Sequence, residues 1–185
     1  MMQGQIEVDS EYGMGSTFTI QLMQKAVGKE KIRSFKPDEL NDIYRGFSGP
    51  RDFTAPDARL LVVDDTPLNH TVIKELVKKC GMQIDTALSG DEALKMAGGK
   101  YYDLIFMDQR MPGLSGAETL AELRKKEGAV SRRVPVISMT ANSYPGIKEA
   151  ERSAGFEDYL EKPIESNKLM ELLIQYLPES KIFYT

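Results

Sequence analysis

Four short runs of apolar residues, each followed by polar residues, constrain the fold of this chain more than any other feature. They occupy residues 60–63, 104–107, 134–139 and 159–160. Runs of this length between polar or turn residues are typical of strands that are buried on both faces of a parallel sheet. The polar residues that follow would then lie together at the carboxyl edge of the sheet, where open α/β sheets bind ligands.

Helical spacing alternates with these strands from about residue 58 to residue 178, and a further short strand is expected at 83–87. Gly81 is placed to end the first helix, and Ser89 is placed to cap the second. Five strands alternating with five helices predict an α/β fold, with a flavodoxin-like, doubly wound parallel sheet in the order 2-1-3-4-5. The switch point of this order lies between strands 1 and 3, so the polar ends of those two strands should be neighbours.

Residues 1–24 carry a separate pattern, in which apolar and polar residues alternate on both sides of a glycine-rich turn. This alternation predicts a β-hairpin. A hairpin alone is marginal in water, and its apolar side chains, among them Ile6 and Ile20, would need cover. Self-association through the hairpin is one way to cover these apolar side chains. The polar residues 25–57 predict a linker, which leaves 58–179 as the main domain.

The composition argues against several classes of function. A formal net charge of -4 argues against a nucleic-acid-binding surface. The sequence contains neither a run of about 18 apolar residues, as a membrane span requires, nor a signal peptide. The single cysteine, Cys80, fits a reducing compartment, and we expect a cytoplasmic location. The single histidine, His70, leaves no cluster for zinc, and we expect it on the surface of the first helix.

The polar residues that follow the apolar runs predict one chemistry. They include Asp64, Asp65, Asp108, Thr140 and Lys162. Asp108 is the candidate nucleophile, because a carboxylate can accept a phosphoryl group as an aspartyl-phosphate. Three clustered carboxylates repel one another, and Mg²⁺, which prefers oxygen ligands, would relieve that repulsion. Lys162 and Thr140 would stabilise the oxygens of the transferring group with a positive charge and a hydroxyl donor.

Four motifs make residues 58–178 resemble the receiver domain of two-component response regulators. The motifs are Leu61-Val62-Val63-Asp64-Asp65, Phe106-Met107-Asp108-Gln109-Arg110-Met111-Pro112, Met139-Thr140-Ala141 and Tyr159-Leu160-Glu161-Lys162-Pro163. The resemblance implies the phosphoacceptor of a phosphorelay, in which Asp108 takes a phosphoryl group from phosphohistidine. It also implies that the receiver catalyses its own phosphorylation and dephosphorylation at this aspartate.

The same resemblance implies how the metal is held. It implies that Asp65, Asp108 and the backbone carbonyl of Arg110 ligate Mg²⁺, with Asp64 helping through water. It further implies that the Lys162–Pro163 peptide bond is cis, a conformation essentially confined to bonds that precede proline.

A conformational switch is also implied. Thr140 would move toward the phosphoryl group, Tyr159 would rotate inward, and the surrounding face would change. Arg110 and Asn142 flank the site and are expected to tune the lifetime of the phosphate. The expected partner is a histidine-phosphotransfer domain or a cognate histidine kinase.

Residues 1–24 resemble the end of the ATP-binding domain of a histidine kinase, through segments such as Gly13-Met14-Gly15-Ser16. The segments that bind ATP in that domain do not occur in this chain, and His70 does not lie in a dimerisation motif. We therefore expect no histidine kinase activity from it. We interpret the chain as the C-terminal part of a hybrid histidine kinase, a kind of protein that is compatible with a membrane anchor elsewhere.

Two alternatives remain open from the sequence. A phosphohydrolase of the haloacid-dehalogenase kind also forms an aspartyl-phosphate, but it needs an Asp-x-Asp motif after the first strand, and Asp64-Asp65-Thr66 lacks it. A receiver-like module that binds proteins without phosphate is the second alternative. It would not require the acceptor residues, all of which are present.

Overall fold

The computed structural model describes residues 4–11, 15–22, 52–141 and 146–184. The chain divides into two units, residues 1–46 and 47–185. In the first unit, strand β1 (Gly4–Glu11) pairs antiparallel with β2 (Gly15–Leu22), which confirms the predicted hairpin. Of its apolar side chains, Ile6 is 69% exposed and Ile20 is 63% exposed, so this unit leaves apolar side chains uncovered.

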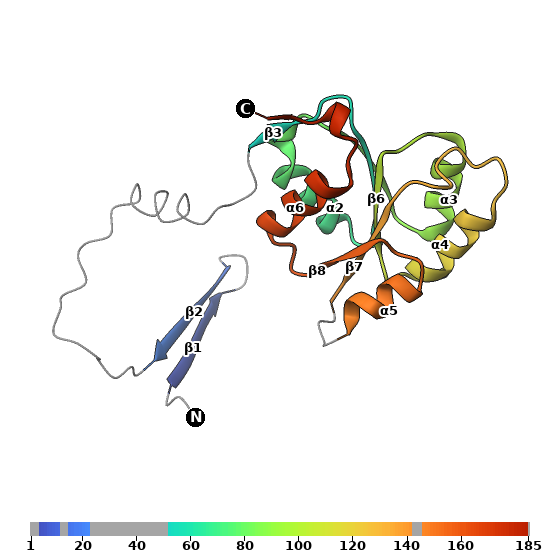
Figure 1. The fold of residues 1–185 in the computed structure, drawn as a ribbon. Helices are drawn as coiled ribbons and strands as arrows, with labels where there is room; N and C mark the ends of the chain where they lie inside the picture. Colours follow the sequence, from blue (N-terminus) through green and yellow to red (C-terminus); the bar gives the residue numbers. More distant parts are fainter. Residues whose placement is uncertain (1–3, 12–14, 23–51, 142–145, 185) are drawn as a thin grey trace. The chain divides into compact units, whose positions relative to one another are not determined.

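The second unit is built on a five-stranded parallel sheet (Figure 1). Its strands are β4 (Arg59–Val63), β5 (Gln83–Ala87), β6 (Leu104–Asp108), β7 (Val136–Thr140) and β8 (Asp158–Glu161). Their spatial order is β5-β4-β6-β7-β8, and every neighbouring pair is parallel. This is the predicted order 2-1-3-4-5, with the switch point between β4 and β6.

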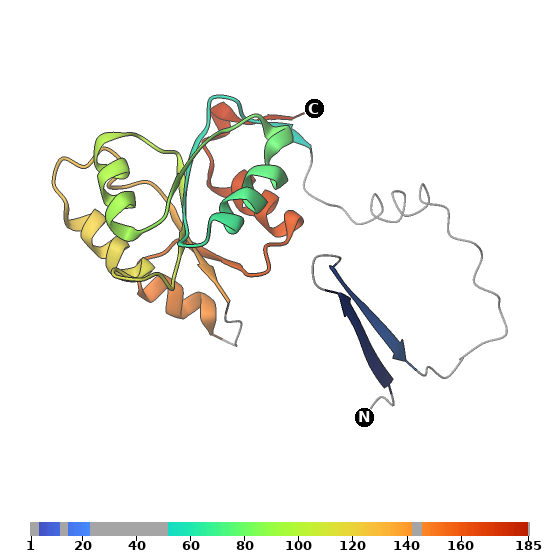
Figure 2. The same ribbon diagram turned by 180° about the vertical axis from the view of Figure 1, so that it is seen from behind.

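Five helices connect the strands and cover the sheet. They are α2 (Pro67–Leu76), α3 (Gly90–Gly99), α4 (Gly116–Lys125), α5 (Ile147–Ser153) and α6 (Ser166–Tyr176). Figures 1 and 2 show α2 and α6 together on one face of the sheet, and α3 and α4 on the other. The fold is therefore doubly wound, as the alternation of strand and helix patterns predicts.

The central strands β4 and β6 consist mainly of apolar residues because each one contributes to two cores. In β4, Leu60 and Val62 belong to the core beneath α2 and α6, whereas Leu61 and Val63 belong to the core beneath α3 and α4. All four side chains are fully buried. A strand with helices on both faces has no polar side, which explains the continuous apolar runs of the sequence.

Local signals set the ends of the helices. The Ser89 hydroxyl accepts a hydrogen bond from the Glu92 backbone N–H at 3.2 Å and caps α3. Ser115 and Glu118 form a capping box at the start of α4. Gly81 adopts a left-handed conformation with φ of 71° after the short 3-10 turn that follows α2, a conformation that glycine accepts without steric cost.

Two short strands extend this unit beyond the segment 58–179. Strand β3 (Phe53–Thr54) pairs antiparallel with β9 (Phe183–Tyr184). Phe53 and Ala55 are buried in the core beneath α2 and α6, although they lie in the segment interpreted as a linker. At the other end, the Lys181 ammonium lies 2.8 Å from both carboxylate oxygens of the buried Asp103. The compact unit therefore uses chain on both sides of the predicted domain.

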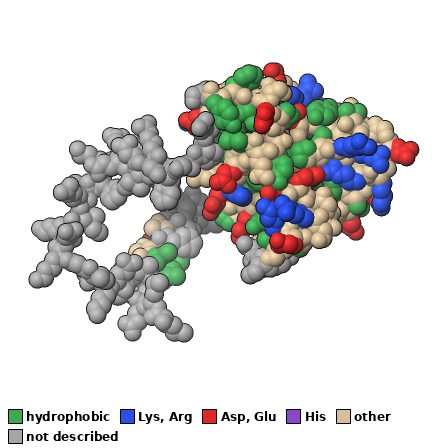
Figure 3. All heavy atoms as spheres, viewed as in Figure 1, with side chains coloured by type: hydrophobic (Ala, Val, Ile, Leu, Met, Phe, Trp, Pro, Cys, Tyr) green, Lys and Arg blue, Asp and Glu red, His purple; other side chains and the backbone are tan. Residues whose placement is uncertain are grey.

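The surface of this unit is mixed in character. Figure 3 shows acidic, basic and apolar side chains interspersed on the face in view. Among the residues that the structure describes, no helix is long and apolar enough to cross a membrane.

The two-sided core leads to a stability prediction. Leu173→Ala removes a fully buried side chain of α6, and it should lower the free energy of unfolding by about 2–5 kcal/mol. The matched control is Leu68→Ala in α2, where the side chain is 67% exposed and the change should stay within about 0.5 kcal/mol. Urea unfolding followed by circular dichroism measures both, and equal effects would contradict the assignment of the core.

Candidate functional site

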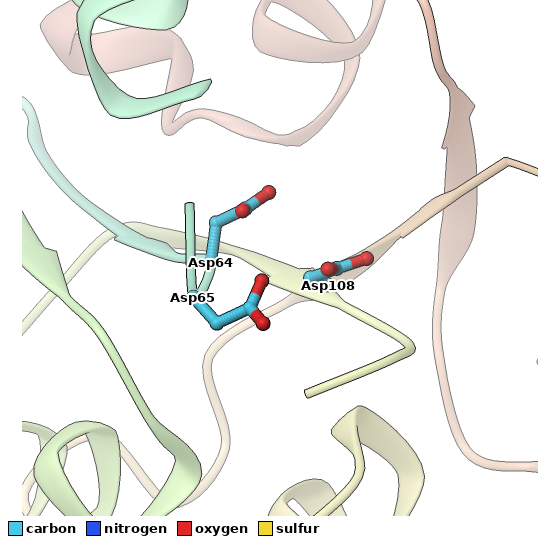
Figure 4. A group of neighbouring side chains, drawn as sticks. All are labelled: Asp64, Asp65 and Asp108. Carbon is cyan, nitrogen blue, oxygen red and sulfur yellow. The ribbon is translucent and has the colours of Figure 1, made fainter. Parts of the chain in front are cut away.

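The order of the sheet brings three carboxylates together. Asp64 and Asp65 follow β4, and Asp108 is the last residue of β6, the neighbouring strand. One carboxylate oxygen of each residue lies within 4.8 Å of the others. Figure 4 shows the side chains reaching into the same space from the ends of the two strands. Asp64 is 0% exposed and Asp108 is 7% exposed, whereas Asp65 is open to solvent.

Lys162, directly after β8, reaches the two buried carboxylates. Its ammonium nitrogen lies 2.7 Å from Asp64 Oδ2 and 3.0 Å from Asp108 Oδ1. Its backbone N–H donates to the carbonyl oxygen of Thr140 at 2.8 Å, which joins the ends of β7 and β8. The Lys162–Pro163 peptide bond is cis, as predicted.

Burial and neighbouring charges shift the pKa values of Asp108 and Lys162 in opposite directions. Burial raises the pKa of the Asp108 carboxyl, although the hydrogen bond from Lys162 acts against that rise. For Lys162, burial alone would lower the pKa, but the hydrogen bonds to Asp64 and Asp108 outweigh it, and the pKa is raised. Lys162 therefore stays an ammonium, and three carboxylates against one ammonium leave two formal negative charges when all are ionised. A divalent cation matches that excess, and the oxygen donors suit Mg²⁺.

Asp64 is held by residues that the sequence analysis did not single out. The Asn69 side-chain amide donates to both Asp64 carboxylate oxygens at 2.9 Å, and the Thr66 backbone N–H donates to Oδ1 at 2.9 Å. Because Asn69 lies in the first turn of α2, the start of that helix orients Asp64. Its position five residues after Asp64 is the only signal in the sequence, and it becomes informative once Pro67 is taken as the start of the helix.

The chain around Asp108 is also tightly placed. The Gln109 backbone N–H donates to the Met139 carbonyl oxygen at 3.0 Å, and the Gln109 carbonyl oxygen accepts from the Gly116 N–H at 3.2 Å. A Cβ atom at Gly116 would clash with the Asp108 carbonyl oxygen, so α4 approaches the phosphoacceptor candidate through a position that only glycine can fill. The sequence analysis did not single out Gly116.

The remaining predicted residues lie around this cluster where the structure describes them. Thr140 is the buried last residue of β7, next to β6 in the sheet. Tyr159 lies half-buried on β8, opposite Ser138 in the register. Arg110 is exposed two residues after Asp108. Asn142 lies outside the described residues. The roles in switching and tuning that were assigned to these residues stay predictions.

The prediction for His70 was wrong. This residue is 6% exposed, and its Nε2 has no hydrogen-bond partner in the described structure. His70 shares a helix face with Ile73 and Val77, three and seven residues further on, and both of these are fully buried. Burial lowers the pKa of His70. The histidine thus belongs to the packed face of α2 beside Asp64, not to the surface.

Comparison with known families agrees with this geometry. The family described as the response regulator receiver domain matches residues 60–174. The chain belongs to this family. Membership favours the receiver over the phosphohydrolase that the sequence had left open.

The curated relatives of this chain include sensor kinases. The aerobic respiration control sensor protein ArcB of Escherichia coli is 30% identical over 175 residues, which are 95% of this chain and 21% of ArcB. An alignment of that extent reaches beyond the receiver into the residues before it. The chain spans about a fifth of the length of this relative.

Solved structures of receivers share the fold. The receiver domain of the sensor histidine kinase PA1611 of Pseudomonas aeruginosa, solved with magnesium in its active-site cleft, is 36% identical. It superposes with a TM-score of 0.57 over 64% of this chain and 96% of that one. The response regulator TrrA of Thermotoga maritima, in complex with Mg²⁺ and beryllium fluoride, is also 36% identical, with a TM-score of 0.56 over 65% of this chain and 99% of that one.

The exposed carboxylate leads to a test of the cation site. Asp65→Asn should weaken Mg²⁺ binding at least about tenfold, because a ligand charge is lost. Folding should change little, because the contact that the structure gives the Asp65 side chain is a 3.2 Å hydrogen bond from the Thr66 hydroxyl. Isothermal titration calorimetry measures the affinity.

The matched control is Asp57→Asn, an exposed carboxylate just before β4, at the opposite edge of the sheet. Its Mg²⁺ affinity should equal that of the unmodified chain. Equal affinities for the Asp65 and Asp57 variants would show that the cation does not bind at the cluster.

Proposed function

We propose that this chain is a phosphoacceptor receiver, and that Asp108 takes a phosphoryl group from a phosphohistidine. One observation supports this role above the others. A mostly buried carboxylate lies at the switch point of the sheet, bonded to Lys162 and within reach of two further carboxylates. Mg²⁺ would be held by Asp65, Asp108 and the backbone carbonyl of Arg110, with Asp64 assisting through water.

The proposed reaction is a direct transfer. A carboxylate oxygen of Asp108 forms a new P–O bond as the P–N bond to the donor imidazole breaks, and the electron pair of that bond stays on the imidazole nitrogen. The transferring group carries its charge on the phosphoryl oxygens, so stabilisation depends on positive charge and hydrogen-bond donors placed around it.

The residues around Asp108 can supply that stabilisation. The Lys162 ammonium is already 3.0 Å from Asp108 and would turn toward the phosphoryl oxygens. Thr140, at the end of the adjacent strand, would donate a hydrogen bond from its hydroxyl to a phosphoryl oxygen. Mg²⁺, when bound by the carboxylates, would neutralise charge on the same oxygens and favour the ionised form of Asp108.

The signalling output is proposed to follow from the same site. Movement of Thr140 toward the phosphoryl group would be followed by rotation of Tyr159, which is half-buried on β8. Arg110 and Asn142 would tune how long the phosphate persists.

We further propose that the chain comes from a hybrid histidine kinase in the cytoplasm. Residues 1–24 would be the end of the kinase ATP-binding domain, followed by a linker and by the receiver, which includes Phe53 and Ala55 from the end of the predicted linker. The 95% coverage in the alignment with ArcB and the free Cys80 support this reading. The partner would be a histidine-phosphotransfer domain or a cognate histidine kinase.

Intact mass spectrometry tests the proposal. After incubation with acetyl phosphate and Mg²⁺, the chain should gain one phosphoryl group, and the gain should disappear with EDTA or in Asp108→Asn. Mass is the suitable readout because the chain contains no tryptophan for a fluorescence assay. No gain from acetyl phosphate or from a phosphorylated histidine-phosphotransfer domain would reject the proposal in favour of phosphate-independent binding.

The exposed hairpin leads to a separate prediction on self-association. Because Ile6, Val8 and Ile20 are exposed, the hairpin should pair between chains. The full chain should then elute as an oligomer in size-exclusion chromatography with light scattering, and deletion of residues 1–46 should yield a monomer. The deletion stops at 46 because Phe53 belongs to the receiver core. The same oligomeric state before and after the deletion would rule out a role for the hairpin.

A further inference from the structure

The residue directly after Asp108 is bonded to a helix far along the chain. The Gln109 side-chain amide donates a hydrogen bond to Glu151 Oε2 at 2.6 Å, across 42 positions of sequence. Glu151 lies on α5, and its side chain is almost inaccessible, with the residue 5% exposed. A single contact thus joins the loop that carries the phosphoacceptor to α5.

Glu151 depends on this contact. The ion pairs formed among the described residues do not include Glu151, and Gln109 is the side-chain partner that the described structure gives it. A buried carboxylate is costly unless its oxygens keep their hydrogen bonds. The contact therefore constrains both residues, because losing it leaves a charged group buried without a donor.

Helix α5 has few other anchors among the residues that the structure describes. It is seven residues long, and its N-cap residue, Gly146, offers no side-chain cap. Ile147 is buried, and Lys148 lies 3.5 Å from Asp158 of β8. Glu151 is the other buried residue of this helix, and its carboxylate attaches α5 to the loop after β6.

Gln109 is in turn fixed to two other elements. Its backbone bonds to β7 through Met139 and to α4 through Gly116 fix the chain directly after Asp108. Consecutive side chains of a strand point to opposite faces, and the Gln109 side chain is directed toward α5, where it meets Glu151. A phosphoryl group on Asp108 would add negative charge one residue away, and a shift of the backbone there would move the Gln109 amide relative to Glu151.

We propose that Glu151 is a positioning residue, and that its hydrogen bond to Gln109 carries the phosphorylation state of Asp108 to α5. The inference rests on the proposed function of Asp108. A phosphoryl group at Asp108 shifts the backbone of the next residue and changes the bond from the Gln109 amide to Glu151, and α5 responds because Glu151 is one of its two buried residues. The equilibrium of α5 shifts by the difference in the strength of this bond between the two states.

Hydrogen exchange of the full chain tests this inference. Mass spectrometry of peptides that cover α5 is compared with and without beryllium fluoride and Mg²⁺, which imitate the phosphorylated state. In the unmodified chain, exchange in α5 should change when the analogue is added. Gln109→Leu and Glu151→Leu should reduce that change at least about threefold, because each breaks the same bond from one side.

Two further variants separate signalling from structural damage. Glu151→Gln keeps an acceptor oxygen for Gln109 and should restore the response of α5. Glu149→Leu removes an exposed carboxylate from the same helix and should leave the response intact. Gln109→Leu leaves every side chain of α5 in place and removes only the donor to Glu151.

Intact mass spectrometry measures the uptake of a phosphoryl group from acetyl phosphate in every variant. This measurement distinguishes a failure of the proposed function from a failure of the inference about Glu151. If the unmodified chain takes up no phosphoryl group, the proposed function and this inference are both overturned. If uptake is normal but α5 responds equally in all variants, or does not respond in the unmodified chain, the inference alone is overturned.

Discussion

The ammonium of Lys162, shared between two buried carboxylates, is the interaction on which the site depends. Asp64 and Asp108 lie on neighbouring strands because the sheet reverses its winding between β4 and β6. One carboxylate oxygen of each residue lies within 4.8 Å of the other. Two buried negative charges at this separation would repel strongly in a medium of low dielectric constant. The ammonium of Lys162 offsets the repulsion between Asp64 and Asp108. The exposed Asp65 adds a further negative charge, and the resulting excess favours a divalent cation.

The fold supports this arrangement from both sides. Layers of apolar side chains beneath α2 and α6, and beneath α3 and α4, fix the strands and so fix the polar groups at the strand ends. The start of α2 orients Asp64 through Asn69, and the start of α4 meets the backbone of Asp108 at Gly116. The packed layers thus hold the reactive groups at one edge of the sheet. Helix α5 buries only Ile147 and Glu151, so it is suited to change its position.

Much of this could be predicted from the sequence, because strand patterns and the residues after them are local signals. The apolar runs predicted four of the five strands, and the doubly wound order predicted that Asp64 and Asp65 would lie beside Asp108. The strands β3 and β9 were missed because two-residue strands have no periodicity to recognise. The burial of His70 was missed because a polar residue on a helix face is read as exposed unless its neighbours at helical spacing are considered.

The bond between Gln109 and Glu151 could not be predicted at all. It joins residues 42 positions apart, and neither residue type signals a partner. Contacts of this kind depend on how helices pack after the sheet has formed, and the pattern of a single sequence does not encode which polar side chains then meet.

Asp108 is the residue that we propose carries the phosphoryl group. Reduction of the phosphorylated chain with borohydride converts an aspartyl-phosphate into homoserine, which tandem mass spectrometry can locate. The account predicts homoserine at position 108 and at no other aspartate. Homoserine at position 64 or 65, or a phosphoryl group that resists reduction, would contradict it.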